Sequence, residues 1–329
     1  MNSAPEISII TPVRNGSIYL TECFQSIIKQ SFTNFEWIII NDHSTDNTPE
    51  LLNDFKAHDS RIHVYENQGK GIIDALNTAT ELARGIFITR MDADDRMPVY
   101  KLENLLGLLE NQTNTVATGH VKYIENEHLK AGYMRYADWL NLMCDNHLHY
   151  RDIFRECPLA SPAWMMRKED FVRIGGFKDL EYPEDYDFAF RCFENSVKIV
   201  STSDVVHEWR DYPERTSRND PNYADNSFID LKLRRYFQLF YSLTEPLTVW
   251  GAGKKGKEIA RKLIEREIEF DWVCDNPNKI GVDIYGKKLK HYSTLKSGQA
   301  IIYVTSTEDQ ETIHEYLENH PDIKFHWFC

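Results

Sequence analysis

Strand and helix patterns alternate through the first part of the chain, and this order restricts the possible folds more than any other feature. The predicted strands cover residues 7–12, 35–40, 62–65 and 85–89. Apolar residues recur at helical spacing between them, and Thr48 followed by Pro49 marks the start of the second helix. A β-α-β-α-β-α-β order favours a mostly parallel sheet with helices on both faces. We therefore predict an α/β fold for this region.

Three carboxylates crowd the end of the last of these strands. Asp92, Asp94 and Asp95 follow residues 85–89 directly. Like charges this close raise one another's pKa, so we expect a positive partner, and a hard divalent cation shared with a phosphorylated ligand fits that need. In open α/β sheets, ligands bind at the carboxyl ends of strands, which is where these acids fall. A solvated acidic turn is the simpler alternative.

Composition limits the class of protein. A chain of 329 residues fits two domains, and its net charge of −13 argues against general nucleic-acid binding, which needs a basic surface. The six cysteines include no C-x-x-C pair, which indicates reduced thiols in a cytosolic protein. We find no signal-peptide pattern and no apolar stretch of about 18 residues. We expect a cytoplasmic protein and leave peripheral association with the inner face of a membrane open.

The polar clusters at the strand ends, taken together with their spacing, resemble family 2 glycosyltransferases of the GT-A fold. The resemblance covers roughly residues 5 to 240. Residues 12–16 are similar to the family's first nucleotide-binding turn, 40–46 to its D-D-G-S-T-D element, and 90–95 to its D-x-D element. Asn41 and His43 depart from the commonest residues of the second element.

The resemblance implies a role for each strand-end cluster. Asp42 would accept a hydrogen bond from the base of a nucleoside diphosphate sugar, most simply uracil, although an Asx-turn role is the structural alternative. Asp92 would hold the ribose hydroxyls, and Asp94 would ligate Mn²⁺ or Mg²⁺ on the diphosphate. The nucleotide-sugar site would comprise Thr11, Pro12, Arg14, Asn15, Asp42, Asp92 and Asp94.

Residues 181–187 match the family's E-D motif, which precedes its acceptor-side helix. Asp185 is the predicted general base, because a sugar hydroxyl is a poor nucleophile near neutral pH and a positioned carboxylate can take its proton. Attack from the face opposite the diphosphate would invert the anomeric carbon. Glu184 is the alternative base. Both acids would also stabilise the helix by lying at the positive end of its dipole, which is the structural alternative.

Several residues further along are weaker candidates. His207 lies where GT-A enzymes often place a late metal-ligating histidine, and neutral imidazole suits Mn²⁺ better than Mg²⁺. Ser161 stands where many relatives have histidine. Three arginines of a polar segment are expected either to close over the diphosphate or to be solvated: Arg210, Arg215 and Arg218. Two tryptophans are expected to stack on sugar rings or, more simply, to fill the core: Trp164 and Trp209.

A second unit is predicted after Thr244-Glu245-Pro246, giving domains 1–243 and 244–329. Its first strand runs into a G-x-G-x-x-G turn and a helix, the context that gives this motif meaning, and Asp275 ends the next strand where a ribose-binding acid belongs. The unit resembles small Rossmann-like domains fused to sugar-modifying enzymes. Its predicted nucleotide-binding residues are Gly251, Gly253, Gly256 and Asp275. A purely structural or regulatory domain is an equal alternative.

These observations favour an inverting, metal-dependent glycosyltransferase that moves a sugar from a UDP-sugar to a glycan, lipid-linked or protein acceptor in surface glycan synthesis. The chain lacks a Q-x-x-R-W element, which argues against a processive synthase. One alternative is an NAD(P)-dependent sugar-nucleotide oxidoreductase acting through the second domain, and another is a non-catalytic sugar-nucleotide sensor. The donor sugar, linkage and oligomeric state are left open.

Overall fold

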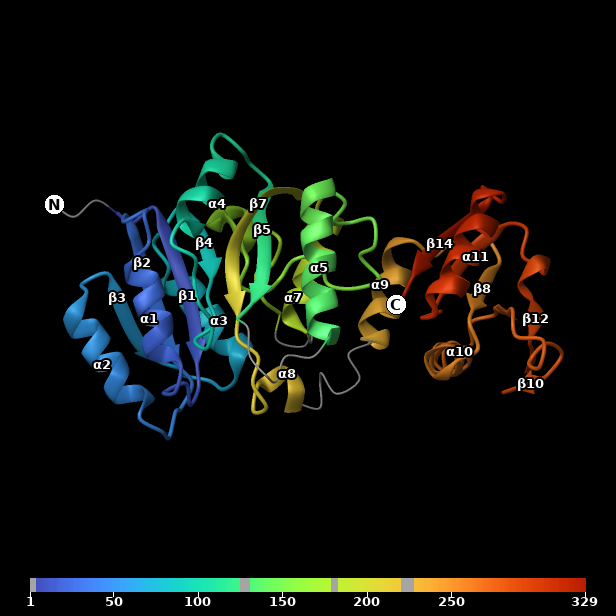
Figure 1. Cartoon of the computed structure of the whole chain (residues 1–329), viewed down its shortest axis with the longest axis horizontal. Helices are drawn as coiled ribbons and strands as arrows, with labels where there is room; N and C mark the ends of the chain where they lie inside the picture. The colour runs from blue at the N-terminus through green and yellow to red at the C-terminus, as the bar shows by residue number, and fades with distance from the viewer. Residues whose placement is uncertain (1–3, 125–130, 179–182, 220–227) are drawn as a thin grey trace. The chain divides into compact units, whose positions relative to one another are not determined.

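The structure is a computed structural model that describes residues 4–124, 131–178, 183–219 and 228–329. Its described residues fall into two compact units (Figure 1). The first contains those of 1–151 and 157–224, and the second contains 152–156 and those of 225–329. Glu181 and Tyr182 of the E-D motif lie outside the described residues.

A seven-stranded sheet forms the centre of the first unit, in the order β3-β2-β1-β4-β6-β5-β7. Among the described strands of this sheet, only β6 runs antiparallel to its neighbours, so the prediction of a mostly parallel sheet is confirmed. The strands are β1 Ile7–Val13, β2 Phe35–Asn41, β3 Ile62–Glu66, β4 Phe87–Arg90, β5 Thr115–Tyr123, β6 Trp164–Arg167 and β7 Lys198–Trp209. The helices are α1 Leu20–Ile28, α2 Thr48–His58, α3 Ile72–Leu82, α4 Lys101–Leu109, α5 Ala131–Asn146, α6 Lys168–Arg173, α7 Glu184–Glu194 and α8 Thr216–Asn219.

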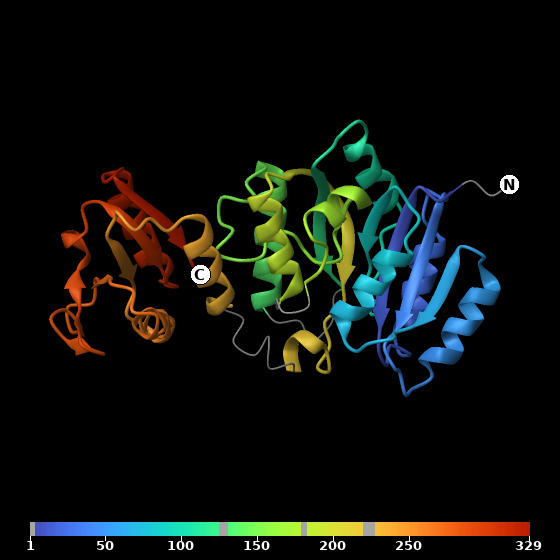
Figure 2. The ribbon, with the colours of Figure 1, turned by 180° about the vertical axis from the view of Figure 1, so that it is seen from behind.

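Helices cover both faces of this sheet. Helix α1 lies in front of β1 and β2 in Figure 1, and α3 lies in front of the same strands in Figure 2, which shows the opposite side. All seven residues of β2 are buried, which matches its largely apolar sequence. Helix α1 turns Leu20, Phe24 and Ile27 toward the core at helical spacing.

The sheet brings the three polar clusters to one edge. Strand β1 pairs in parallel with both β2 and β4, so the carboxyl ends of all three strands point the same way. The strand order also reverses between β1 and β4, which is the position where open α/β sheets bind ligands. The acids that follow β4 therefore lie beside the turns that follow β1 and β2.

The second unit has its own parallel sheet, in the order β12-β9-β8-β13-β14. Numbered along the chain, this is the order 3-2-1-4-5 found in dinucleotide-binding folds. Its strands are β8 Leu247–Trp250, β9 Asp271–Cys274, β12 Lys290–His291, β13 Gly298–Ile302 and β14 Ile323–Trp327, with a small hairpin of β10 Asp283–Ile284 and β11 Lys287–Lys288. Its helices are α9 Ile229–Leu239, α10 Lys254–Glu265 and α11 Thr307–Glu318, with a 3₁₀ turn at Tyr292–Thr294.

Helix α9 groups with the second unit, whereas the predicted boundary at 243/244 leaves it in the first. That boundary stays a prediction. In the part of the chain that is described, no helix has the length and apolar character needed to cross a membrane.

Candidate active site

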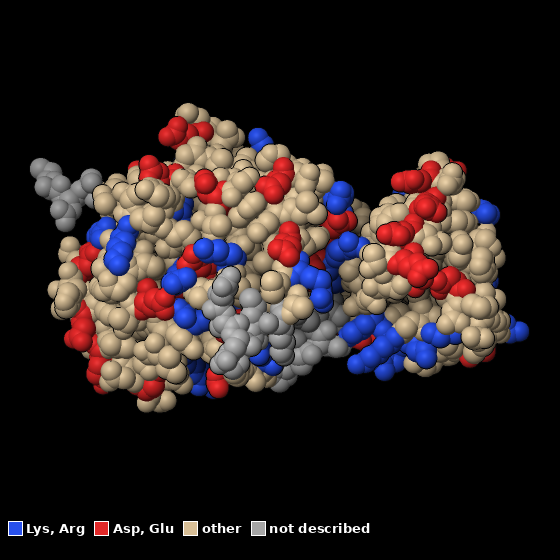
Figure 3. All heavy atoms as spheres, in the orientation of Figure 1, with Lys and Arg blue, Asp and Glu red and all other residues tan. Residues whose placement is uncertain are grey.

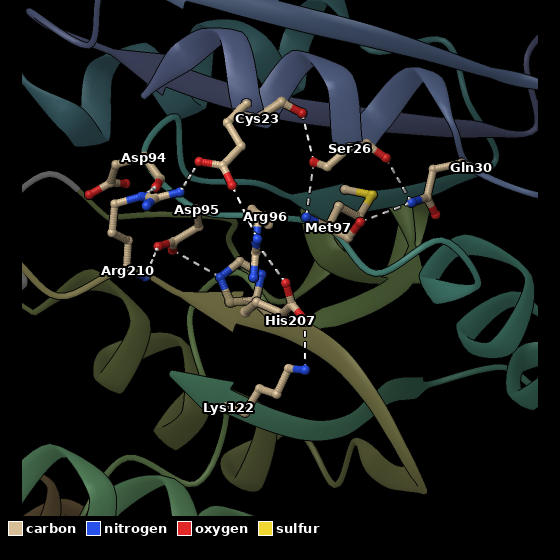
Figure 4. A network of polar contacts seen from close by, with 12 residues as sticks. Cys23, Ser26, Gln30, Asp94, Asp95, Arg96, Met97, Lys122, His207 and Arg210 are labelled. Atoms are coloured by element: carbon tan, nitrogen blue, oxygen red, sulfur yellow. Dashed lines mark hydrogen bonds and ion pairs between the residues drawn. The ribbon is translucent and has the colours of Figure 1, made fainter. Parts of the chain in front are cut away.

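The acids after β4 form hydrogen bonds with residues that come much later in the sequence of the first unit, at positions 207–212. Asp95 is fully buried, and its Oδ2 lies 2.9 Å from Nε2 of His207 on β7. Its Oδ1 accepts from the backbone N–H of Arg210 at 2.7 Å (Figure 4). Asp94 accepts from the Tyr212 hydroxyl at 2.9 Å, and its carbonyl accepts from the Arg210 guanidinium. The acid run is therefore a packed, hydrogen-bonded cluster and not a solvated turn.

Burial and mutual repulsion make two of these carboxyls weak acids. Burial, the nearby Asp95 and, less strongly, Asp92 raise the pKa of Asp94 to about 7, against the opposing effect of Arg215. Burial also raises the pKa of Asp95 to about 7. Asp92 differs: burial alone would raise its pKa, but Arg90 outweighs this effect and holds it below its usual value. The raised pKa values of Asp94 and Asp95 indicate that the neighbouring arginines do not fully neutralise the negative charge of the cluster.

Arg90 connects the acid run to the E-D motif. Its Nε donates to Asp92 at 2.8 Å and its Nη1 donates to Glu184 at 2.7 Å. Both Arg90 and Glu184 are buried, and the second carboxylate oxygen of Glu184 is also buried and has no hydrogen-bond partner among the described residues. The end of β4 and the start of α7 are therefore in direct contact through Arg90 and Glu184.

Asp185, the predicted base, is half-buried beside this pair. Its Oδ1 accepts from the backbone N–H of Tyr186 at 2.7 Å. Burial and the adjacent Glu184 raise the pKa of Asp185 to about 7, while Arg90 opposes the shift. A carboxylate that takes up protons near neutrality is suited to act as a general base at physiological pH.

His207 is fully buried, and burial keeps its pKa well below the ordinary value, so the imidazole is neutral. We assign the Nε2–H to the hydrogen bond with Asp95, which leaves the lone pair on Nδ1. That Nδ1 is buried and has no partner among the described residues. A histidine that gives one N–H to a carboxylate and keeps the other nitrogen free is the usual arrangement of a metal ligand.

The turn after β2 is built around Asp42. Its carboxylate accepts from Asn67 at 2.7 Å and from the backbone N–H of Gly71 at 3.0 Å, which fixes the entry to α3. The Asn67 Oδ1 atom is buried without a partner in the described residues. Asp42 is thus partly committed to structure, while the neighbouring amide offers a spare acceptor.

The turns after β1 and β2 are tied together. Asn15, at a φ of 52°, accepts from the Thr45 N–H at 2.8 Å, and its own N–H donates to Ser44. Arg14 is exposed next to this contact. The Thr11 hydroxyl is buried and accepts from Trp37 at 2.8 Å, so it is committed to the core beneath Pro12.

The three arginines of the polar segment are not simply solvated. Arg210 contacts the acid run as described and also donates to Glu22. Arg215 lies close enough to Asp94 and Asp95 to lower the pKa of both. Arg218 pairs with Asp211 instead. Arg210 and Arg215 thus place positive charge beside the acids.

The two tryptophans belong to the core. Trp164 is buried against Phe171 and Phe188, and Trp209 packs on Tyr136. Core packing, the simpler of the two expectations, therefore accounts for both tryptophans. Ser161 has a buried hydroxyl without a partner in the described part of the chain.

Packing explains two of the three glycines of the second unit. A Cβ on Gly256 would lie 2.2 Å from the Gly251 carbonyl oxygen, and one on Gly251, at a φ of +124°, would lie 2.3 Å from the Tyr303 oxygen. A Cβ on Gly253 would meet no atom within 4 Å, and Asp275 is exposed. The close-packed turn is present, but these contacts are equally those of a structural domain.

Sequence reasoning missed three residues of the site: Asn67, Lys101 and Tyr212. The sequence offered one indication for Lys101: a lysine in the first turn of a helix is disfavoured by the helix dipole, so it suggests a compensating partner. Asn67 and Tyr212 sit in turns whose composition is ordinary for loops. Among the described residues, no group of three or more His, Cys, Asp or Glu side chains is arranged to hold a metal by itself.

Comparison with known proteins identifies the relatives of this arrangement. A family model described as "Glycosyl transferase family 2" matches residues 8–175. Glycosyltransferase GlyG of Streptococcus pneumoniae serotype 4 is 34% identical over 215 residues, which cover 62% of this chain and 70% of GlyG.

Two solved structures share the GT-A fold. S. aureus TarS 1–349 in complex with UDP-GlcNAc superposes with a TM-score of 0.57 at 18% identity, covering 80% of this chain and 72% of that one. The mannosyltransferase PcManGT of Pyrobaculum calidifontis, in complex with GDP-Man and Mn²⁺, has a TM-score of 0.50 at 19% identity over 72% and 64%.

Proposed function

The chain belongs to glycosyltransferase family 2 and is a glycosyltransferase, and we propose that it transfers a sugar from a UDP-sugar to a hydroxyl acceptor with inversion at the anomeric carbon. The acceptor is a glycan, a lipid-linked intermediate or a protein, and the role is in surface glycan synthesis. The observation that carries the proposal is Arg90, whose guanidinium contacts Asp92 of the acid run and Glu184 of the E-D motif. This shared contact supports a single site in which Asp92 would face the donor and the E-D motif would face the acceptor.

The nucleoside half of the donor would bind where the turns after β1 and β2 meet. Asp42 and the spare Oδ1 of Asn67 offer acceptors for a base N–H. Thr11, Pro12, Arg14 and Asn15 form the adjoining turn. Asp92, which Arg90 keeps ionised, would accept from the ribose hydroxyls. Support for a nucleotide sugar also comes from TarS, which was solved with UDP-GlcNAc.

A divalent cation, Mn²⁺ or Mg²⁺, fits the chemistry of the remaining groups. Asp94 is a half-buried carboxyl whose pKa is raised to about 7, and added positive charge would favour its ionised form. The unpaired Nδ1 of neutral His207 is a second donor. Asp94 and His207 are therefore the residues that we propose would hold the cation. When bound, the cation would offset the charge of the departing diphosphate.

The acceptor hydroxyl would be activated by Asp185. As its oxygen attacks the anomeric carbon, the carbon–oxygen bond to the diphosphate breaks and the hydroxyl proton passes to the Asp185 carboxylate. Glu184 is held by Arg90 through one oxygen, so we propose that it orients this region. Asp185, whose pKa is raised to about 7, would return the proton to solvent after each cycle.

Peripheral membrane association stays a prediction. Basic side chains gather around α9 and α10 on the face shown in Figure 3. Several are paired: Lys255 with Glu258, and Lys262 with Asp230. Lys232 of α9 is buried, so it is not available to contact a membrane surface.

The proposal is tested by incubating the enzyme and Mn²⁺ with a panel of nucleotide sugars and measuring nucleotide release. We expect release from one UDP-sugar, with the sugar configuration inverted in the product by NMR. Asp185→Asn should lower turnover on the order of 10²- to 10⁴-fold, the usual contribution of a general base. The matched control is Asp54→Asn, an exposed aspartate of α2, which should leave turnover unchanged. Absence of release from every nucleotide sugar would refute the proposal.

A further inference from the structure

Lys101 is a buried cation that the proposed reaction does not yet use. It is the first residue of α4, and its side chain is 0% exposed. Moving an ammonium out of water is strongly unfavourable unless it is paired and hydrogen-bonded. A chain retains such a group at this position only if its surroundings compensate that cost.

The compensation comes from two carbonyl groups at the bottom of the site. Lys101 Nζ donates to the Pro162 carbonyl at 2.5 Å and to the Arg90 carbonyl at 3.4 Å. Arg90 is the last residue of β4, two positions before Asp92. Pro162 precedes β6, in a segment anchored by the hydrogen bond from Thr118 to the Ala163 carbonyl. The ammonium thus joins the start of the acid run to the segment before β6.

The same ammonium also contributes charge to the acid cluster from the protein interior. Burial lowers the pKa of Lys101 to about 7, and the nearby Asp92 and Asp95 oppose this shift because they favour the charged amine. Arg215 and Arg210 supply positive charge from the polar segment. Lys101 therefore interacts with the same acids as these arginines, but from a buried position.

We propose that Lys101 is a positioning residue that fixes the acid run relative to the segment before β6, and so sets the geometry in which the donor is held. This inference rests on the proposed function, because it assigns the acid run to donor binding. Lys101 touches neither donor nor acceptor. Its effect passes through the Arg90 and Pro162 carbonyl groups, whose separation it determines.

The chain contains a matched control in its second unit. Lys232 of α9 is also buried, and its Nζ donates to two carbonyls, those of Arg155 at 3.0 Å and Phe328 at 3.1 Å. Lys101→Met and Lys232→Met remove the same ammonium from the same kind of surroundings. Both should change thermal stability. Only Lys101→Met should change donor use.

The test compares kcat and KM for the donor in wild type, Lys101→Met, Lys101→Arg and Lys232→Met, each well below its melting temperature. We expect kcat/KM to fall on the order of 10- to 100-fold in Lys101→Met, as for a misplacement of about 1 Å. Lys101→Arg, which keeps the charge and the donors, should recover part of it. Lys232→Met should stay within about twofold of wild type, since distant sites act independently.

Two results would overturn the inference. One is a Lys101→Met enzyme that melts earlier but keeps wild-type kcat/KM, and the other is an equal loss of kcat/KM in Lys232→Met. If Lys101→Met does not fold, Lys101→Gln, which keeps an N–H donor in a neutral amide, answers the same question by the same criterion. Failure of the proposed function is distinguishable, because wild type itself would then release no nucleotide.

Discussion

Arg90 donates a 2.7 Å hydrogen bond to Glu184, a residue 94 positions later in the chain, and both side chains are buried. The same guanidinium holds Asp92. This single cation is shared between the acid run after β4 and the carboxylates at the start of α7. A substrate that binds beside Asp92 is therefore affected by the charge of Glu184 through Arg90, and the converse also holds.

Replacing Arg90 should affect both stability and turnover. Arg90→Met leaves Glu184 buried without its cation, and breaking a buried pair in this way typically costs about 3–5 kcal/mol. We expect a lower melting temperature and a large loss of nucleotide release. Arg61→Met is the control: Arg61 pairs with Asp59, both side chains are partly exposed, and about 0–1 kcal/mol is usual for exposed pairs. Equal melting temperatures for the two variants would contradict the role of Arg90.

The pKa of Asp185 predicts a pH dependence with a definite sign. A base must be ionised to accept a proton, so kcat/KM should rise as pH increases through about 7. The contribution of this carboxyl to stability should change in the opposite sense. The folded protein holds this proton more tightly than the unfolded chain, so the contribution is fully present below about pH 4, the ordinary carboxyl range, and is lost as pH rises to about 7.

Thermal melts across this pH range, in the absence of metal, check the prediction. Asp185→Asn removes the titrating group and should flatten the dependence, although Asp94 and Asp95 contribute in the same direction. A wild-type protein that becomes steadily more stable from pH 4 to 7, with the same slope in Asp185→Asn, would show that the carboxyl is not perturbed in this way.

His207 should contribute to cation binding through Nδ1. His207→Gln keeps an N–H that can reach Asp95 but lacks the free ring nitrogen. We expect Mn²⁺ affinity to fall on the order of 10- to 100-fold, measured by the stabilisation that Mn²⁺ and UDP together give in a thermal melt. His149→Gln, at a buried histidine next to Cys144, should leave that stabilisation intact. Unchanged affinity in His207→Gln would remove His207 from the metal site.

The glycine turn of the second unit should tolerate substitution unevenly. Gly256→Ala places a Cβ 2.2 Å from the Gly251 carbonyl oxygen, and such overpacking typically costs about 1–3 kcal/mol. Gly253→Ala meets no neighbour within 4 Å, so the poor N-cap preference of alanine at the start of α10 is its only cost, roughly 0.5–1 kcal/mol. Calorimetry of the two variants compares them directly. A larger loss in Gly253→Ala than in Gly256→Ala would contradict the described packing.

Local pattern was enough for the strands that are buried on both faces. The apolar periodicity of the sequence was enough to predict β1, α1 and β2. The alternating strand–helix order was enough to predict a mostly parallel sheet. Strand β7 was missed, because most of its residues are half-buried or exposed and its sequence alternates weakly. Its pairing with β5 is what carries His207 to the acid run.

The sequence by itself determined which chemistry was available: three acids at the end of a buried strand, an E-D pair before a helix, and a glycine turn in a second α/β unit. The tertiary structure decided which groups meet. His207 reaches Asp95 across 112 positions, and Lys101 turns inward beneath Arg90. Periodicity reports only whether a side chain faces the core or the solvent. Contacts over such separations depend on how the strands pair, and this is set by the packing of the whole sheet.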